Sequence, residues 1–600
     1  MEKRTYHLVF LLLFAFISSK IYGQETKKKP AHVLITAGQS NTDGRVSNTL
    51  LPAYIKPWAS DSLYVKGNYP FCKISQNDGS GTFVPFWPKG SITEGRWTYD
   101  AIVYYHFAQA LQEDFYVVKW AVGGTSIGMP SDSAKGRYWY ANPTWLSQTS
   151  AVEKGGKSLL LSFTDAIDAA IEQTLSQLEQ GYQIDAFLWH QGESDDRFAS
   201  NYYENLKQVV AYVRQHLTAV TGKDYSTLPF IFGSIPKANR HYQPLVEAGM
   251  QRIAEEDPNA YLINMGHMEL QKDRTHFNEK AAEYLGQQMF KVLNQQIKLT
   301  PTEFRIADYQ GDKRCAISYT FDDGLQEHYT LVNPRLNALG FRGTFWINGS
   351  KINPSADHVV DTTRTTWQNL REMARAGHEI SNHGWAHRNF GRFSLEEIKQ
   401  DVSQNDSVLY AEIGMQPLTF CYPNNTKTPE GFAFVNENRV GTRLLQRSLG
   451  GKSTSESLAQ WVADLMESRG WGVGMTHGIT YGYDKFSNPA IFWKHLQQVK
   501  AQEDKIWIGT FREVVAYIKE RKYTTYDVEI TQDGMIVTPH LTLDKTLFTE
   551  KLTGVIDRSG VKKVKIQQGE KILKPQLLPD KVLFDFDPYG GRIVMQIEAR

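Results

Sequence analysis

A serine near the start of the chain and an acid–histidine pair far downstream have the residue types of a nucleophilic centre. Ser40 stands in the sequence GQSN (38–41), directly after the apolar run 32–36, and Asp273 stands three residues before His276. A nucleophilic serine needs an imidazole that accepts its proton and a carboxylate that holds the imidazole's tautomer. Each of these residues alone is commonly structural, so the hypothesis depends on their combination.

Such a centre also needs hydrogen-bond donors aimed at the oxyanion that develops during the reaction. The candidates are the backbone N–H of Ser40, the backbone N–H of Gly123 or Gly124, and the side-chain amide of Gln191. The sequence leaves open which of the two glycines donates.

A second set of residues has the types and spacing of a metal site. Asp322 and Asp323 are adjacent, and a cation or a shared proton must relieve their mutual repulsion. His383 and His387 are four residues apart, which would place them on one face of a helical turn. Two histidines and a carboxylate are also the ligands of non-haem iron oxygenases, so residue types alone leave that alternative open.

The elements around Ser40 read as an α/β unit. Apolar runs at 32–36, 115–122 and 184–189 predict buried strands, and residues 162–178 have helical spacing. In a mostly parallel sheet, ligands gather beyond the carboxyl ends of the strands. The turns at 38–41 and 190–193 are expected at that edge.

A second βα pattern follows a polar linker at 295–303. It begins with the strand 316–320, includes a helix opened by the capping box of Ser394 and Glu397, and ends with the helix 510–521. The last 80 or so residues show alternating runs, with a turn at 533–534 and two runs, 582–586 and 593–597, flanking a turn. This pattern predicts hairpins and a small β-sandwich-like module.

Length and charge limit the function classes. The 600 residues suit several domains, and 66 Lys+Arg against 65 Asp+Glu give a net charge of +1. No net field favours nucleic acid or an anionic membrane, so neither is expected as a partner. Three cysteines are too few for a disulfide framework or a cysteine-based zinc site.

The N-terminus has the pattern of a secretory signal peptide. Lys3 and Arg4 precede an apolar run at 8–19, and small and polar residues follow up to Gly23. The run is shorter than the roughly 20 residues of a membrane span. We therefore expect a signal peptide over 1–23, no membrane span, and a secreted or periplasmic protein.

Four sequence blocks together resemble the SGNH-type esterases. They are GQSN (38–41), AVGGTSI (121–127), WHQGESD (189–195) and DRTH (273–276), and the most similar group is the sialate O-acetylesterase-like one that includes carbohydrate esterase family 6. The resemblance implies a flavodoxin-like three-layer domain over 31–299 without a cofactor. It also implies that Ser40 is the nucleophile, His276 the base and Asp273 its orienting acid.

The middle of the chain resembles the NodB-like polysaccharide deacetylases, carbohydrate esterase family 4. TFDDG (320–324) and GHEISNHGWAH (377–387) are similar to the first two family motifs, and MTHGI (475–479) and WIGTFREVVAYI (507–518) to late segments. The resemblance implies a distorted (β/α) barrel over 305–521, with the β-module at 522–600. The resemblance implies that Asp322 is the general base and that His477 is the general acid. It also implies that Asp323, His383 and His387 bind a divalent metal ion, which we expect to be zinc.

Two features depart from that family. Its third motif carries an arginine that steadies the catalytic aspartate, whereas this chain reads TFCYPNN at 419–425. The acidic partner behind the late histidine is not evident, and Asp464 is the only candidate that we name. We therefore expect an intact metal site with an altered supporting shell, in which metal charge keeps Asp322 ionised.

Both families include enzymes that remove O-acetyl groups from xylan. The leading interpretation is an exported bimodular esterase that deacetylates plant cell-wall polysaccharide, acetylated xylan first, so the expected partner is an acetylated polysaccharide or oligosaccharide. In the alternatives, the second domain N-deacetylates chitin- or peptidoglycan-type polymers, or the first domain is a sialate O-acetylesterase. A non-enzyme alternative is a glycan-binding protein with a degenerate second domain.

Overall fold

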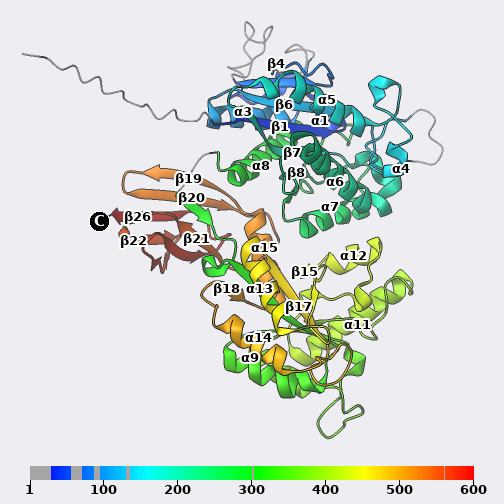
Figure 1. Cartoon of the computed structure of the whole chain (residues 1–600), viewed down its shortest axis with the longest axis vertical. Helices are drawn as coiled ribbons and strands as arrows, with labels where there is room; N and C mark the ends of the chain where they lie inside the picture. Colours follow the sequence, from blue (N-terminus) through cyan, green and yellow to red (C-terminus); the bar gives the residue numbers. More distant parts are fainter. Residues whose placement is uncertain are drawn as a thin grey trace, which may run out of the picture.

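The computed structural model describes residues 29–55, 71–86, 95–129, 136–299, 303–559 and 561–599. The predicted signal peptide at 1–23 lies outside these residues. The described chain is mixed α/β and has three parts, which Figure 1 shows as a blue-to-green upper part, a green-to-orange lower part and an orange-to-red group of sheets beside them.

The first part is built on a seven-stranded sheet. Six neighbouring strands are parallel, and only the edge strand β4 is antiparallel to its neighbour β3. The order is β4 (Val84–Pro85), β3 (Cys72–Gln76), β6 (Phe115–Ala121), β1 (Ala31–Gly38), β7 (Tyr182–His190), β8 (Phe230–Gly233) and β9 (Ala260–Ile263). The three predicted strands are confirmed as β1, β6 and β7.

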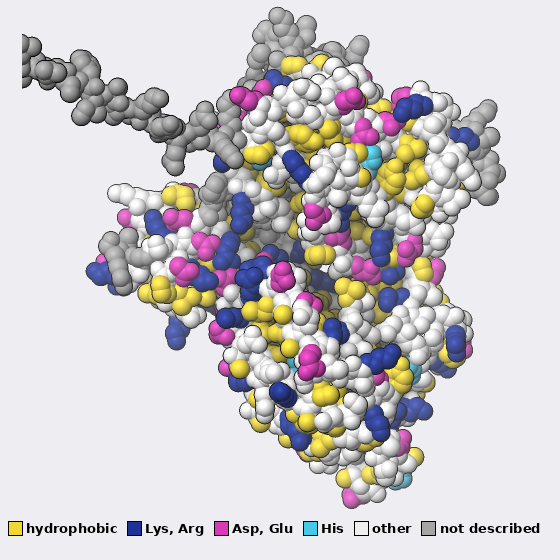
Figure 2. All heavy atoms as spheres, viewed as in Figure 1, with side chains coloured by type: hydrophobic (Ala, Val, Ile, Leu, Met, Phe, Trp, Pro, Cys, Tyr) yellow, Lys and Arg dark blue, Asp and Glu magenta, His cyan; other side chains and the backbone are white. Residues whose placement is uncertain are grey.

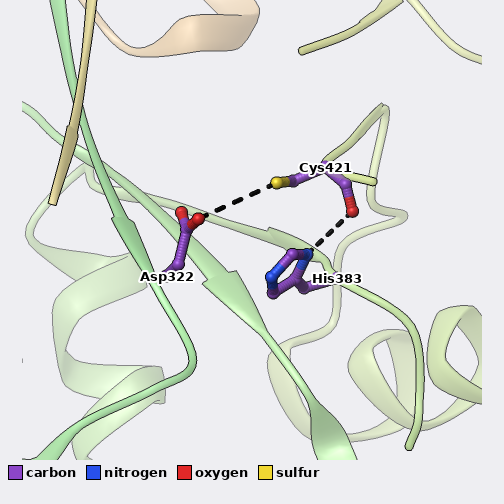
Figure 3. A group of neighbouring side chains, drawn as sticks. All are labelled: Asp322, His383 and Cys421. Carbon is purple, nitrogen blue, oxygen red and sulfur yellow. Dashed lines mark hydrogen bonds between the residues drawn. The ribbon is translucent and has the colours of Figure 1, made fainter. Parts of the chain in front are cut away.

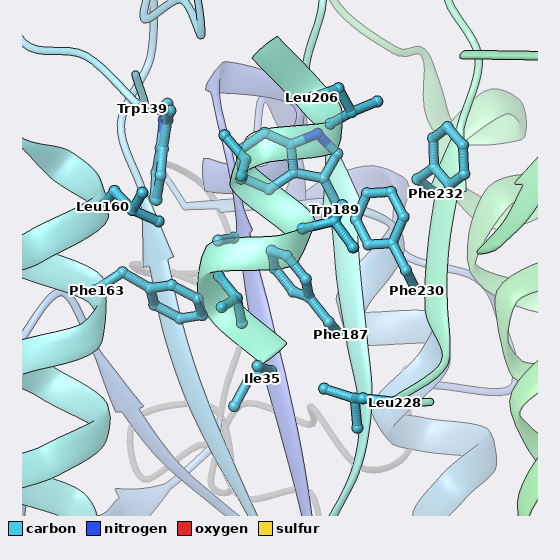
Figure 4. Packing of buried hydrophobic residues seen from close by; sticks show 14 of the residues in the cluster. Ile35, Trp139, Leu160, Phe163, Phe187, Trp189, Leu206, Leu228, Phe230 and Phe232 are labelled. Atoms are coloured by element: carbon cyan, nitrogen blue, oxygen red, sulfur yellow. The ribbon is translucent and has the colours of Figure 1, made fainter. Parts of the chain in front are cut away.

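Helices cover both faces of this sheet. Val33 and Ile35 of β1 join an apolar cluster with α5 (Leu159–Gln173), α6 (Tyr202–Thr221) and α7 (Pro244–Glu256). Leu34 faces the other way, into a cluster with α3 (Tyr99–Leu111) and α8 (Glu279–Ile297). Figure 4 shows the first cluster around Trp189. Burial on both faces explains why the strands read as continuous apolar runs. Assignment to the SGNH fold stays a prediction.

Strand ends bring three of the sequence blocks together. Gly38 at the end of β1 lies in register with Ala121 of β6 on one side and His190 of β7 on the other. The short helix α1 (Ser40–Asp43) follows at once. Gly38 has φ of +149°, and a Cβ there would collide with the His190 carbonyl oxygen. Only glycine allows this close approach of β1 to β7.

The second part is a curled, wholly parallel eight-stranded sheet that forms a half-barrel. Its order is β15 (Gly441–Thr442), β14 (Thr419–Phe420), β13 (Glu379–Asn382), β12 (Thr344–Ile347), β11 (Cys315–Asp322), β17 (Trp471–Thr476) and β16 (Arg447–Ser448), with β18 (Ile506–Ile508) also paired to β11.

The helices of this part are α9 (Asn333–Leu339), α10 (Trp367–Arg375), α11 (Leu395–Ile413), α12 (Pro429–Asn436), α13 (Ser455–Ser468), α14 (Ala490–Lys500) and α15 (Phe511–Tyr523). The predicted capping box of Ser394 and Glu397 is confirmed at the start of α11. The predicted helix 510–521 is confirmed as α15, with Thr510 as its N-cap.

The third part consists of two antiparallel sheets around one apolar core. One contains β19 (Thr525–Thr531), β20 (Gly534–His540), β26 (Ile593–Ala599), β22 (Val561–Gln568) and β23 (Lys571–Leu573). The other contains β10 (Phe304–Ile306), β21 (Leu552–Ile556), β25 (Val582–Phe586) and β24 (Gln576–Leu577). Strand β10 follows the first part in sequence, so the chain reaches this sheet before it enters the half-barrel.

The hairpin prediction is half right. Strands β19 and β20 pair as a hairpin as expected, but the turn lies at residues 532–533, one residue before the expected 533–534, because Gly534 already belongs to β20. Strands β25 and β26 do not pair with each other, because β25 lies between β21 and β24 whereas β26 lies between β20 and β22. The turn at 587–592 therefore carries the chain from one sheet to the other, and alternation of apolar residues does not distinguish these two connections.

The surface and the cysteines agree with the composition. Basic and acidic side chains are interspersed over the face in Figure 2. Cys72, Cys315 and Cys421 are all free and buried. Among the helices that the structure describes, none has the length and apolar character to cross a membrane.

Candidate functional sites

Ser40, Asp273 and His276 lie at one cleft or beside it. Ser40 and His276 both line a cleft of about 800 Å³ at the carboxyl edge of the first sheet. The imidazole Nδ1 of His276 donates to Asp273 Oδ2 at 2.6 Å. Asp273 Oδ1 accepts the backbone N–H groups of Thr275 at 2.9 Å and His276 at 3.0 Å. This arrangement leaves His276 Nε2 as the nitrogen that can act on the cleft.

The charge of Asp273 is stabilised by these contacts. Partial burial alone would raise its pKa, but the hydrogen bonds from the backbone and imidazole of His276 and from Thr275 lower it below the usual value. A carboxylate that stays ionised can hold the Nδ1 proton of the base and stabilise an imidazolium.

The two candidate glycines differ in their distance from the serine. A Cβ on Gly123 would lie 3.3 Å from the Cβ of Ser40 and 2.8 Å from Nη2 of Arg45, so its backbone passes directly beside the serine. Gly124 has φ of +70°, and its Cβ position faces open space. Both line the cleft. The geometry favours the N–H of Gly123 as the donor nearest to Ser40.

Gln191 is placed differently from the other candidates. Its side chain is fully buried and is not among the cleft-lining residues. Its amide nitrogen donates to Asp195, to the carbonyl oxygen of Thr125 at 3.2 Å and to Gln39 Oε1 at 3.3 Å. Its N–H groups therefore bond to buried groups behind the cleft, and no hydrogen bond joins them to Ser40.

A buried polar group beneath Ser40 has no counterpart among the predicted site residues. Glu193 accepts a hydrogen bond from Asn41 Nδ2 at 2.6 Å and contacts His190 Nε2 at 3.0 Å. Burial opposes its charge, but His190 and Asn41 lower its pKa. Because Asn41 follows Ser40 directly, this group fixes the serine's backbone. The block WHQGESD (189–195) contains Glu193, so the sequence could have indicated this residue as part of the site.

Three predicted metal ligands come together in the half-barrel. Asp323 Oδ1 lies 3.7 Å from His383 Nε2 and 3.9 Å from His387 Nε2. One ligand atom from each residue falls within 4.8 Å of the other two. The side chains of Asp323 and His387 are 24% and 32% exposed, so the group opens to solvent on one side.

The histidines reach this position by a bend and not by a helix. His383 follows β13 directly, and residues 383–387 form no helical turn, which corrects the prediction. Gly384 has φ of +76° and His387 φ of +57°. Asp323 also has a positive φ, +77°. Non-glycine residues rarely adopt such angles, and functional sites are where they cluster.

This donor set fits a divalent metal ion. His383 Nδ1 donates to the carbonyl oxygen of Cys421 at 2.8 Å, which leaves its Nε2 free as a ligand. Burial lowers the pKa of His383 to about 4, so the imidazole is neutral, as a ligand must be. Two imidazole nitrogens and a carboxylate oxygen are an ordinary set for zinc.

An alternative group shares His383 with Asp322 and Cys421 (Figure 3). All three side chains are buried, and burial raises the pKa of the Cys421 thiol well above its usual value. Both oxygens of Asp322 already accept hydrogen bonds from Arg443. The group with Asp323 and His387 is therefore the better metal site.

Arg443 overturns the expectation that Asp322 has no arginine beside it. Its Nη1 and Nη2 donate to Asp322 Oδ1 and Oδ2 at 2.7 and 2.5 Å. Burial alone would raise the pKa of Asp322, but the guanidinium lowers it to about 2. The charge of Arg443, rather than metal charge alone, keeps this carboxylate ionised. No local pattern around residue 443 announces this contact, which forms only when the sheet curls.

His477 faces Asp322, whereas Asp464 lies elsewhere. His477 Nε2 is 3.8 Å from Asp322 Oδ2, and its buried Nδ1 has no hydrogen-bond partner. Asp464 lies on α13 and accepts a hydrogen bond from Gln460, so the proposed pairing with His477 is wrong. The backbone of His477 is held instead by His328, whose Nε2 donates to its carbonyl oxygen at 2.7 Å.

Two regions of the chain match the models of known protein families. Residues 30–295 match the model of the carbohydrate esterase, sialic acid-specific acetylesterase family. Residues 310–438 match the polysaccharide deacetylase family.

Curated relatives match only in part. A chitin deacetylase from Pestalotiopsis sp is 26% identical over 98 residues, 16% of this chain and 30% of that protein. An uncharacterised 30.6 kDa protein from Geobacillus stearothermophilus is 24% identical over 184 residues, 30% of this chain. The chain spans 58% of that protein's length.

Two solved structures match this chain at low identity and low TM-score. A family 4 acetyl xylan esterase from Clostridium thermocellum, in complex with cobalt, is 21% identical and covers 33% of this chain and 89% of its own, with a TM-score of 0.25. A protein from Arabidopsis thaliana is 18% identical and covers 44% of this chain and 98% of its own, with a TM-score of 0.30.

Over residues 30–295 the chain is therefore similar to the sialic acid-specific acetylesterase family of carbohydrate esterases, and over residues 310–438 it is similar to the polysaccharide deacetylase family.

Proposed function

We propose that this protein is an exported esterase with two independent acetyl-releasing centres that act on one acetylated polysaccharide, acetylated xylan first. The observation that carries the proposal is the presence of two separate groups of reactive side chains on one chain, each inside a region that matches a family of carbohydrate deacylating enzymes. Export rests on the sequence pattern of residues 1–23.

In the first centre, Ser40 attacks the acetyl carbonyl while His276 accepts its proton. Asp273 holds the Nδ1 proton of His276 at 2.6 Å and stabilises the imidazolium. The backbone N–H groups of Ser40 and Gly123 receive the oxyanion. His276 then gives this proton to the leaving sugar oxygen, which leaves the acetyl group on Ser40. In the second half of the reaction water attacks this acetyl group, His276 accepts the water's proton and returns it to the serine oxygen, and acetate is released.

In the second centre, Asp323, His383 and His387 would hold a divalent ion, which supplies Lewis-acid polarisation of the acetyl carbonyl when bound. Asp322 accepts the proton of the attacking water, and Arg443 holds its carboxylate in place. His477, which is 3.8 Å from Asp322, donates a proton to the leaving oxygen.

A second candidate function differs only in the bond that the second centre cleaves. The match to a chitin deacetylase over 98 residues favours an amide of an N-acetylglucosamine polymer. The same residues could serve that reaction, with His477 protonating a leaving nitrogen in place of an oxygen.

One assay distinguishes these functions. Acetate release from acetyl-xylan and from a chitin oligomer is measured with the wild-type protein, Ser40→Ala and Asp322→Asn. The proposal predicts release from acetyl-xylan that each substitution lowers in part. Release from acetyl-xylan that Ser40→Ala abolishes, together with release from the chitin oligomer that Asp322→Asn abolishes, would establish the second candidate in its place.

A further inference from the structure

Arg443 and Asp322 form a closed contact inside the half-barrel. The two side chains are 2% and 3% exposed, and the guanidinium meets both carboxylate oxygens. Nη1 also donates to Thr320 Oγ1 at 2.9 Å, which ties the arginine to the same strand, β11. A bidentate contact of this kind fixes the orientation of a carboxylate as well as its charge.

The arginine comes from the far edge of the curled sheet. Arg443 follows β15, which is four strands away from β11 in the sheet order. Its backbone N–H donates to the carbonyl oxygen of Phe420 at 2.9 Å, which fixes it beside the end of β14. The curl of the sheet then brings this edge across the mouth of the half-barrel to Asp322.

Cys421 approaches the same carboxylate from the neighbouring strand. It follows β14 directly, and its Sγ lies 4.0 Å from Asp322 Oδ2, the oxygen that Nη2 of Arg443 contacts. Positions 421 and 443 therefore stand at the ends of adjacent parallel strands and face one oxygen. A cysteine side chain is never positively charged, so Cys421 cannot supply the charge that stabilises this carboxylate.

We propose that Arg443 is the positioning residue of the second centre, and that it supplies from the end of β15 the arginine contact that the neighbouring segment TFCYPNN (419–425) lacks. This inference rests on the proposed role of Asp322 as general base. It implies that positions 421 and 443 are alternative origins for one contact, so that exchanging their residues preserves the contact. It also implies that the unusual sequence TFCYPNN does not mark a degenerate site.

The test compares Arg443→Met and Arg443→Lys with a matched control, Arg439→Met. Arg439 is also a buried arginine, and it pairs with Asp406 at 2.6 Å without contacting Asp322. For each purified variant, the kcat and KM of chelator-sensitive acetate release from acetyl-xylan, the zinc content and the urea midpoint are measured.

Arg443→Met should lower kcat by about 10–100-fold with KM and zinc content unchanged, because supporting residues of metal sites act at this scale. Arg443→Lys keeps the charge but loses the bidentate geometry, so its loss should be smaller. Arg439→Met should lower the urea midpoint while kcat stays within about twofold of wild type. A folded Arg443→Met with unchanged kcat, or equal losses in Arg443→Met and Arg439→Met, would overturn the proposal.

Removing one partner of a buried ion pair can prevent folding, so a second variant exchanges the residues: Cys421→Arg with Arg443→Cys. The exchange variant should fold, and its kcat should be at least tenfold higher than that of Arg443→Met. Recovery no better than in Cys421→Ala with Arg443→Met would contradict the exchange.

An independent measurement separates this inference from the proposed function. The double variant Asp322→Asn with Arg443→Met should shift the urea midpoint by less than the sum of the two single variants, because each single substitution already removes the same contact. If the wild-type protein releases no chelator-sensitive acetate, the proposed function fails, whatever the urea midpoints show. If the two shifts of the urea midpoint add, the inference about the contact between Arg443 and Asp322 fails.

Discussion

Neighbouring side chains at the end of β11 have different surroundings and so suit different tasks. Asp322 is buried and held by Arg443, whereas Asp323 is partly exposed and lies 3.7 Å from His383 and 3.9 Å from His387. Types and spacing predicted both aspartates and both histidines. They could not predict Arg443, because its contact depends on the curl of a whole sheet and not on a local pattern.

Substitution of each aspartate should therefore have a distinct effect. Asp323→Asn should lower zinc content, because it removes a charged ligand. Asp322→Asn should keep zinc but lose chelator-sensitive turnover, because an amide cannot accept the proton of water. Metal analysis and acetate release on both variants check this. Loss of zinc from Asp322→Asn, together with retention in Asp323→Asn, would reverse the roles.

Gln191→Ala should act through stability more than through chemistry. Its amide serves the buried Asp195 and the carbonyl oxygen of Thr125, and burial raises the pKa of Asp195 to about 7. Leaving these groups without a donor should cost about 1–3 kcal/mol in the free energy of unfolding, measured with urea. A large loss of kcat with no loss of stability would instead favour a direct role for Gln191 at the oxyanion.

At the scale of elements, apolar runs were sufficient to predict β1, β6, β7 and β11, because buried parallel strands carry apolar residues on both faces. Two connections were not predictable. Residues 383–387 have helical spacing but bend, and the turn at 587–592 crosses between sheets. In both cases contacts with distant residues determine the path of the chain.

Gly38 is the element-level feature on which the first centre depends. A Cβ there would collide with the backbone of β7, so Gly38→Ala should cost at least about 2 kcal/mol of stability and displace Ser40. Gly222→Ala is the matched control. Gly222 has φ of +68° but no neighbour within 4 Å of its Cβ position, so its cost should be about 1 kcal/mol. Equal costs in urea unfolding would contradict this explanation.

At the scale of the molecule, the three parts are joined by specific contacts. Ala248 on α7 packs in an apolar cluster with Phe420, Tyr422 and Phe432 of the half-barrel. Lys519 on α15 pairs with Glu255 at 2.5 Å, and Lys291 on α8 pairs with Asp527 on β19 at 3.1 Å. The cluster includes Tyr422, the residue after Cys421, so the packing between the first two parts extends to the second centre.

Glu520 on α15 gives the junction with the C-terminal sheets a pH dependence. Burial raises its pKa to about 8, and its Oε1 accepts the backbone N–H of Glu550 at 3.0 Å. In the folded protein the carboxyl therefore keeps its proton up to about pH 8, whereas in the unfolded chain it ionises near pH 4.5. Its stabilising contribution is complete below pH 4.5 and is lost as pH rises through about 8.

Glu520→Gln should therefore raise the Tm relative to wild type at pH 9 and change it little at pH 4. Thermal unfolding at the two pH values checks this, with Glu529→Gln on the exposed part of β19 as the control. An equal rise at both values would mean that ionisation of Glu520 is not the cause.

Two chemically independent centres on one chain should differ in their need for a metal ion, so a chelator separates their activities. Acetate release from acetyl-xylan is measured for wild type and Ser40→Ala, each with and without a strong chelator. The serine centre needs no metal, so the wild-type protein should retain part of its activity in the presence of chelator. Ser40→Ala should retain part of the activity when no chelator is added and none when chelator is present. Complete loss of acetate release in chelated wild type, or full release in chelated Ser40→Ala, would mean that the chain does not hold two independent centres.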